Sequence, residues 1–136
     1  MLHSLNTVDL MALLIRAEAD NQPWHGQIAA AYTVVERVKS RPSRYGDTPK
    51  AVMLKPMQYS CFNEPRFWEP FYQPHSPRFE FVRAQAVGVL AGTLANPAPG
   101  ATHYYNPAFA APYWADPKYA KFIAQIGDHI FMREIV

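Results

Sequence analysis

The sequence is poor in cysteine, in glycine and in net charge, and each shortage excludes a class of protein. Cys61 is the only cysteine in 136 residues, so an internal disulfide framework is excluded. The six glycines form no phosphate-binding loop. A formal charge of +2 suits an anionic substrate, but it falls short of the dense Lys and Arg clusters of a nucleic-acid binder.

Long apolar runs are also absent. No uninterrupted run approaches the roughly 18 residues that a membrane span needs, so stable membrane insertion is not expected. The N-terminal residues MLHSLNTVD lack the basic start and the apolar stretch of a secretory signal. The remaining composition, 49% hydrophobic and 18% charged residues, is ordinary for a globular protein, and we expect one domain over residues 1–136.

Proline, by contrast, is abundant, and several of the thirteen prolines mark helix starts. A capping side chain stands directly before a proline at Thr48-Pro49, Ser76-Pro77 and Asp116-Pro117. These pairs predict helices over residues 49–54, 77–94 and 117–126, with Gly127 ending the last one. The period of apolar residues predicts a further helix from about Pro23 to Lys39, and a first helix that begins at Asn6 or Thr7 and ends between Ala19 and Asn21.

Two unusual loops separate these helices. Residues 57–77 hold six aromatic residues and four prolines, and we expect them to follow stiff, extended paths. The loop over residues 96–114 contains a candidate strand at 102–105, which could pair with a second candidate at 130–133. The predicted fold class is therefore α+β, mainly helical, with a small antiparallel β element.

One carboxylate stands among the apolar residues of the first helix. With Met11 set at zero, Leu14, Ile15 and Glu18 fall at about 300°, 40° and 340° around the helix. The charged residues Asp9, Arg16 and Asp20 fall near 140° to 180°, on the opposite side. Glu18 therefore shares the face that packs inward, where an unpaired ionised carboxylate would be costly.

Three explanations of this carboxylate stay open on spacing alone. The helix could have nearly ended, with Glu18 pointing to solvent. Glu18 could instead pair with a buried Arg or Lys. The third reading is a proton donor at the wall of a cleft, since burial raises the pKa of a carboxyl and general acids that work near neutral pH need such a shift.

Four sequence blocks together follow the pattern of one known family. The first consists of Ala17-Glu18-Ala19, Pro23, Gly26-Gln27 and Arg37-Val38. The others are Met57-Gln58-Tyr59-Ser60, Ala101 to Pro107 (ATHYYNP) and Ile126 to Arg133 (IGDHIFMR). In these residues, in their order and over nearly its whole length, the chain resembles the SleB-like cell-wall hydrolases, a family of spore cortex-lytic enzymes and phage or prophage lysins.

The resemblance implies a lysozyme-like fold and a single catalytic domain. It implies cleavage of the β-1,4 bond between N-acetylmuramic acid and N-acetylglucosamine in peptidoglycan by a lytic transglycosylase, which leaves a 1,6-anhydro end. Glu18 corresponds to the catalytic acid of the family. The implied partner is the glycan strand, acted on by a monomer without cofactor. With no export signal seen, the resemblance fits an endolysin of a phage or prophage, held in the host cytoplasm before lysis and then acting at the cell wall.

The chain departs from the family pattern where a second glutamate is expected. That position is Gln22, and Asp20-Asn21 replaces Arg-Gly before it. A mechanism with one carboxylate survives this change. Two alternatives remain: a hydrolytic muramidase that uses a second carboxylate, Glu64 or Glu69, and a non-catalytic peptidoglycan-binding domain.

Sugar-binding side chains are expected in the two loops. The candidates are Gln58, Tyr59, Ser60, Tyr104, Tyr105, Asn106 and Trp114. The cluster Phe67, Trp68, Phe71 and Tyr72 is either a clamp over the groove or a satellite core. The five histidines lack metal-binding spacing, although His103 and His129 could be neighbours on the two strands, and Cys61 is expected to be a buried, inert thiol.

Overall fold

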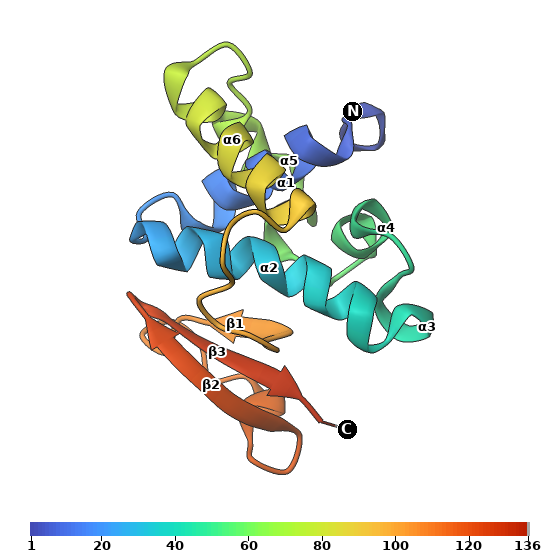
Figure 1. The fold of residues 1–136 in the computed structure, drawn as a ribbon, viewed down its shortest axis with the longest axis vertical. Helices are drawn as coiled ribbons and strands as arrows, with labels where there is room; N and C mark the ends of the chain where they lie inside the picture. Colours follow the sequence, from blue (N-terminus) through green and yellow to red (C-terminus); the bar gives the residue numbers. More distant parts are fainter. Residues whose placement is uncertain (136) are drawn as a thin grey trace.

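A helical body and a small sheet form the two layers of the molecule. The computed structural model describes residues 1–135. Within them the helices are α1 (Thr7–Ala19), α2 (Trp24–Ser40), α3 (Pro42–Tyr45), α4 (Pro49–Leu54), α5 (Pro65–Trp68) and α6 (Pro77–Ala91). Short 3-10 helices are η1 (Leu2–Ser4), η2 (Ser60–Phe62), η3 (Glu69–Phe71) and η4 (Tyr113–Ala115). The strands are β1 (His103–Tyr105), β2 (Ala120–Ile126) and β3 (His129–Glu134), in the sheet order β1-β3-β2. The α2 helix lies between α6 and the sheet (Figure 1).

The helix starts follow from the capping residues. Asn6 accepts a hydrogen bond from the Asp9 backbone N–H at 2.8 Å, as expected for the cap of α1. Thr48 and Ser76 cap α4 and α6 in the same way, each directly before a proline. The predicted first helix, the Pro23 helix and the 49–54 helix are thus confirmed. The α6 helix ends three residues before the predicted Leu94, because Gly92 adopts the left-handed conformation with φ 72°.

The helix predicted over residues 117–126 is wrong. Asp116 caps a turn instead, since its side-chain oxygen accepts from the Lys118 N–H at 2.9 Å and its carbonyl from the Tyr119 N–H at 2.8 Å. Residues 120–126 then form β2, which pairs antiparallel with β3. Gly127, with φ 58°, belongs to the two-residue turn of this hairpin and does not end a helix.

The two predicted strands do pair with each other. His103 lies opposite Met132 and Tyr105 opposite Ile130 in the antiparallel β1-β3 ladder. The 57–77 loop differs from the stiff, extended path predicted for it. It contains η2, α5 and η3, because Pro65 and Pro70 occupy first-turn positions in which proline favours a helix.

The aromatic cluster of this loop divides between core and surface. Trp68 is buried, and Phe71 and Tyr72 pack against the main core formed between α1, α2 and α6. Phe67 remains 41% exposed. Three of the rings thus belong to the main core and not to a separate satellite core. A clamp over the groove stays a prediction for the exposed ring of Phe67.

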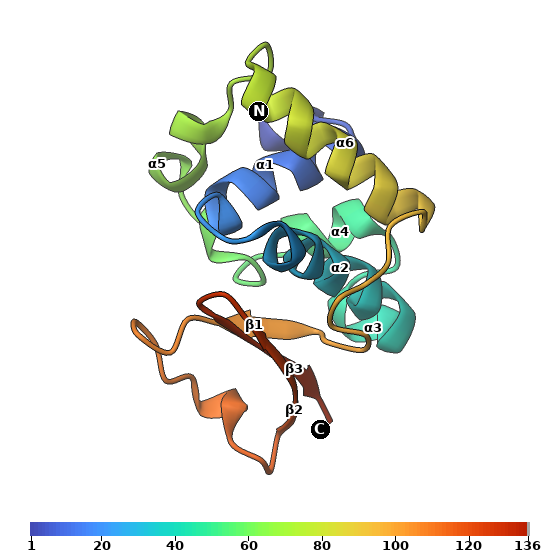
Figure 2. The same ribbon diagram turned by 60° about the vertical axis from the view of Figure 1, so that its left-hand side comes forward.

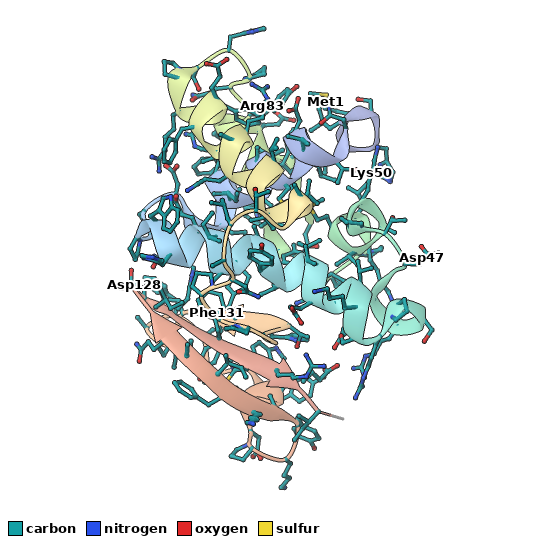
Figure 3. All side chains as sticks on the ribbon, in the orientation of Figure 1. Met1, Asp47, Lys50, Arg83, Asp128 and Phe131 are labelled. Carbon is teal, nitrogen blue, oxygen red and sulfur yellow. The ribbon has the colours of Figure 1, made fainter. Side chains whose placement is uncertain are left out.

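A second, smaller core joins the sheet to the helices. Fully buried Phe131 of β3 packs against the alanines of α1 and α2, and Figure 3 shows it beside α2. The members of this core are Ala19, Ala29, Ala30, Ala98, Ala101 and Phe131. Small side chains on α2 let the sheet approach closely, and Figure 2 shows β1 as the strand nearest the helices. The central strand β3 is thereby held, through Phe131, against Ala19 at the end of α1.

Gln22 fastens the hairpin to the turn between α1 and α2. Its side-chain oxygen accepts from the Asp128 N–H at 2.9 Å, and its NH2 group donates to the Asp128 carboxylate at 3.0 Å. A Cβ atom on Gly127 would lie 2.6 Å from the Gln22 oxygen and 2.7 Å from Pro23, so only glycine fits. Gln22, the residue at the position of the second family glutamate, thus connects the helical layer to the sheet by hydrogen bonds.

Candidate active site

A cavity of about 700 Å³ lies between the helices and the sheet. We call it the main groove. Glu18 lines it, together with all the sugar-binding candidates predicted from the sequence: Gln58, Tyr59, Ser60, Tyr104, Tyr105, Asn106 and Trp114. Residues far apart in the chain, from the end of α1, the segment before η2 and the loop around β1, therefore meet in one place.

Glu18 stands in the last turn of α1 with its side chain partly buried. Burial raises the pKa of its carboxyl, and the Cys61 backbone N–H and thiol and the Ser60 hydroxyl oppose that rise by hydrogen bonding. No ion pair within residues 1–135 includes Glu18. The carboxyl is thus neither a solvated helix end nor half of a buried salt bridge, and it faces the groove as an acid that holds its proton more tightly than usual.

Two buried polar atoms of residues that line the main groove have no hydrogen-bond partner among the described residues. They are the Tyr104 hydroxyl and Nδ1 of His129. The Tyr104 hydroxyl is near enough to lower the pKa of Glu18 slightly, yet it lies outside the geometry of a full hydrogen bond. The two rings pack 5.1 Å apart, and both line the main groove. Buried polar groups are normally satisfied, so this pair is placed to accept or donate hydrogen bonds to a ligand.

Arg37 connects several of the segments that line the groove. Its Nε donates to the Thr102 carbonyl at 2.6 Å and its Nη1 to the Gln58 side-chain oxygen at 2.9 Å. The guanidinium also lies 4.6 Å from the centre of the Tyr59 ring. Tyr59 itself is buried and bonds Thr33 at 2.9 Å, so it supports the floor and offers little exposed ring. Arg37 holds Gln58 in a fixed orientation.

Aromatic rings form the wall on the sheet side. His103 packs 4.9 Å from Trp114 and 5.9 Å from Tyr45, and Tyr105 meets Trp114 edge-on at 5.5 Å. Burial, with the nearby charges of Arg37 and Arg44, lowers the pKa of His103 to about 3, so the ring is neutral at ordinary pH. His103 and His129 both line the groove. No group of three or more His, Cys, Asp or Glu side chains in residues 1–135 is arranged to hold a metal ion.

The other carboxylates are arranged differently from Glu18. Asp20 pairs with Arg16 at 2.9 Å and Arg78 at 3.1 Å, and Glu64 pairs with Arg66 at 2.9 Å. Neither Asp20, Glu64 nor Glu69 lines the main groove. Glu134, which the sequence interpretation missed, does line it, but Arg44 lies 3.2 Å from its carboxylate and the Tyr45 hydroxyl donates to it. Glu134 thus has an ion-pair partner, unlike Glu18.

The rim of the groove carries a strained residue. Met57 has φ 68°, follows Pro56 in a tight turn and is 79% exposed. This turn position ordinarily takes glycine, because a left-handed conformation costs other residues roughly 1–2 kcal/mol. Residues with backbone strain cluster at functional sites, and Met57 lines the main groove.

A mainly helical body, a small antiparallel sheet and a groove between them are the features of the predicted lysozyme-like α+β fold class. The chain belongs to the cell wall hydrolase family, whose model matches residues 21–132. This match confirms the resemblance drawn from the four sequence blocks. The part of the chain that the structure describes contains no helix of the length and hydrophobicity that crossing a membrane requires.

Similar proteins are spore cortex-lytic enzymes. The one from Oceanobacillus iheyensis is 29% identical over 96% of this chain, and the one from Bacillus subtilis (strain 168) is 27% identical over 94%. The chain spans 43% and 38% of their respective lengths, less than half of each. Among solved structures, the catalytic domain of the germination-specific lytic transglycosylase SleB from Bacillus anthracis matches with a TM-score of 0.75 at 24% identity, over 96% of both chains. This match shows that the two share a fold.

Proposed function

We propose that this chain is a peptidoglycan-cleaving lytic transglycosylase in which Glu18 is the general acid and then the general base. The observation that carries the proposal is the position of Glu18, a partly buried carboxyl with a raised pKa and no ion-pair partner, in a groove lined by aromatic, amide and cationic groups. Membership of the cell wall hydrolase family supports a glycan-strand substrate. The names of the cortex-lytic relatives and of SleB support the same class of reaction.

The reaction follows from the single acid. Glu18 donates its proton to the oxygen that bridges the two sugars, and the bond from the muramic acid C1 to that oxygen breaks. The Glu18 carboxylate then takes the proton of the C6 hydroxyl of the same sugar while that oxygen attacks C1. The acid is thereby restored and no water is consumed. Proton transfer of this kind contributes typically 10²- to 10⁴-fold, and positioning and electrostatics supply the rest.

The remaining groove residues bind and orient the sugars in this proposal. Tyr104 lies near Glu18, and His129 packs against the Tyr104 ring. The acetamido group of a sugar in the groove could meet the unsatisfied polar atoms of both residues. Asn106 uses its side-chain oxygen to bond the Ala108 N–H at 2.9 Å, so its NH2 group serves the ligand as a donor. The rings of Trp114 and Tyr105 offer faces for sugar stacking.

The test is digestion of purified peptidoglycan by the wild-type chain and by Glu18→Gln. The wild type is expected to release fragments that end in 1,6-anhydro-muramic acid, one water lighter than hydrolysis products. Glu18→Gln is expected to lose at least about 10²-fold in rate, the lower bound of a general acid's contribution. Undiminished digestion by Glu18→Gln would overturn the assignment.

The same experiment decides between this proposal and its alternatives. Fragments with reducing, hydrated ends would indicate a hydrolytic muramidase, which requires a second carboxylate; loss of activity in Glu64→Gln or Glu69→Gln would then identify it. Cosedimentation with peptidoglycan and no fragments from either form would indicate a non-catalytic binding domain. An origin as a phage or prophage endolysin stays a prediction.

A further inference from the structure

A second cavity, of about 380 Å³, lies on the α5 side of Glu18. Its lining residues come from the end of α1, from η2 and from α5 and η3: Ala17, Glu18, Ser60, Cys61, Arg66, Phe67 and Phe71. The α5 helix contacts α1, η2 and η3, so the four elements that line the cavity are neighbours. Figure 2 shows α5 beside α1. We call it the α5 cavity.

Glu18 and Ser60 line both cavities. Glu18 therefore stands at the junction of the main groove and the α5 cavity, with space for a ligand on either side. A general acid must lie within hydrogen-bond reach of the oxygen it protonates. That oxygen joins two sugars, so a bond placed at Glu18 has a sugar on each side, and each of the two cavities is lined by Glu18.

The lining of the α5 cavity contains the kinds of side chain that bind sugars. The Arg66 guanidinium lies 4.8 Å from the centre of the Phe67 ring, and Glu64 pairs with Arg66 at 2.9 Å. Phe67 nevertheless remains 41% exposed, while its neighbour Trp68 is buried in the core. The cavity thus combines an exposed, braced aromatic ring with the hydroxyl of Ser60 and the carboxyl of Glu18.

We propose that the α5 cavity binds the sugar on the far side of the cleaved bond from the main groove, with Phe67 as the ring on which that sugar stacks. The inference rests on the proposed function, because it places the two sugars about the bond that Glu18 protonates. In this proposal α5 positions the glycan strand along the two cavities. The protein then cleaves bonds within a glycan strand that occupies both cavities.

The test compares Phe67→Ala with Phe81→Ala. Phe81 is a matched control: it is 48% exposed, lies 5.9 Å from the guanidinium of Arg78, and lines neither of the two cavities at Glu18. On purified glycan strands, Phe67→Ala is expected to raise KM about fivefold or more with little change in kcat, because stacking binds the substrate and the transition state alike. Phe67→Tyr should restore KM, and Phe81→Ala should leave it within about twofold.

Equal KM values for Phe67→Ala and Phe81→Ala, with thermal midpoints like that of the wild type, would overturn the inference. A thermal midpoint lowered in Phe67→Ala alone would make Phe67→Tyr the deciding variant, since it keeps the ring. If the wild type releases no fragments, the proposed function fails separately. Cosedimentation of the same variants with insoluble peptidoglycan then decides the binding site, and equal binding would overturn it.

Discussion

At the scale of the residue, the proposed function depends on a carboxyl, that of Glu18, which is partly buried and has no cationic partner among the described residues. Glu18 shares the inward face of α1, where burial disfavours its charged form and raises its pKa. Neutralising that charge with an Arg or Lys would stabilise the fold and remove the proton that the reaction needs. Ser60 and Cys61 supply neutral hydrogen-bonding groups, which oppose the shift without abolishing it.

The cost of this arrangement predicts a pH-dependent stability difference. The folded state holds the Glu18 proton more tightly than the unfolded state, so stability falls as pH rises from about 4.5 through the raised pKa. Glu18→Gln lacks this loss. It should match the wild type below the unfolded pKa and be more stable, by about 0.5–2 kcal/mol, above the folded pKa.

Urea unfolding at pH 4 and pH 8 measures this difference. Glu69→Gln serves as the control, because Glu69 is exposed and lines neither cavity at Glu18. A Glu18→Gln variant that is less stable than the wild type at pH 8 would show that the carboxylate is stabilised where it stands.

The sequence predicts some site residues better than others. Glu18 could be predicted because its helical phase contradicts its charge, and the other groove candidates because they stand in family blocks. His129 and Arg37 also stand in family blocks, but nothing in their local pattern indicates that their side chains reach the groove. His129 reaches the groove only through the register of the β2-β3 hairpin, and Arg37 only because β1 and Gln58 meet above α2.

At the scale of the element, the hairpin shows where local signals conflict. Asp116-Pro117 has the form of a helix start, and Gly127 the form of a helix end. The alternative signal was also present: Gly127-Asp128 between two apolar runs is typical of a two-residue hairpin turn. Pairing with β3 over residues 120–126 decides in favour of the strand, which is a tertiary effect that local propensity does not contain.

The hydrogen bonds between Gln22 and Asp128 of this hairpin give a second prediction. Gln22→Ala leaves the Asp128 N–H without its acceptor and should lower the free energy of unfolding by about 1–3 kcal/mol. It should also lower kcat, because the hairpin positions His129 beside Tyr104. Gln22→Glu should be destabilised too at neutral pH, since its carboxylate would face that of Asp128.

Chemical unfolding and glycan-strand kinetics measure both effects. Gln125→Ala is the matched control, an exposed glutamine in β2 of the same hairpin. If Gln22→Ala were no less stable than Gln125→Ala, Gln22 would not fasten the two layers.

At the scale of the whole molecule, the groove exists because two layers meet along α2. Phe131 and the facing alanines bring the sheet against the helices, and Arg37 and Gln22 join the layers at separate points. Glu18, Ser60 and Tyr104 come from three distant parts of the chain and share one cavity. Composition and helix caps predict the layers, whereas the depth of the groove depends on packing between them.

The most direct measurement is the titration of the Glu18 carboxyl carbon in the folded protein by NMR, with Glu18→Gln identifying the signal. The account predicts a midpoint clearly above the ordinary value of 4.5, and a fall in the rate of glycan cleavage as pH rises through that midpoint. A midpoint at or below 4.5 would contradict it, because Glu18 would then reach its substrate without the proton that the reaction requires.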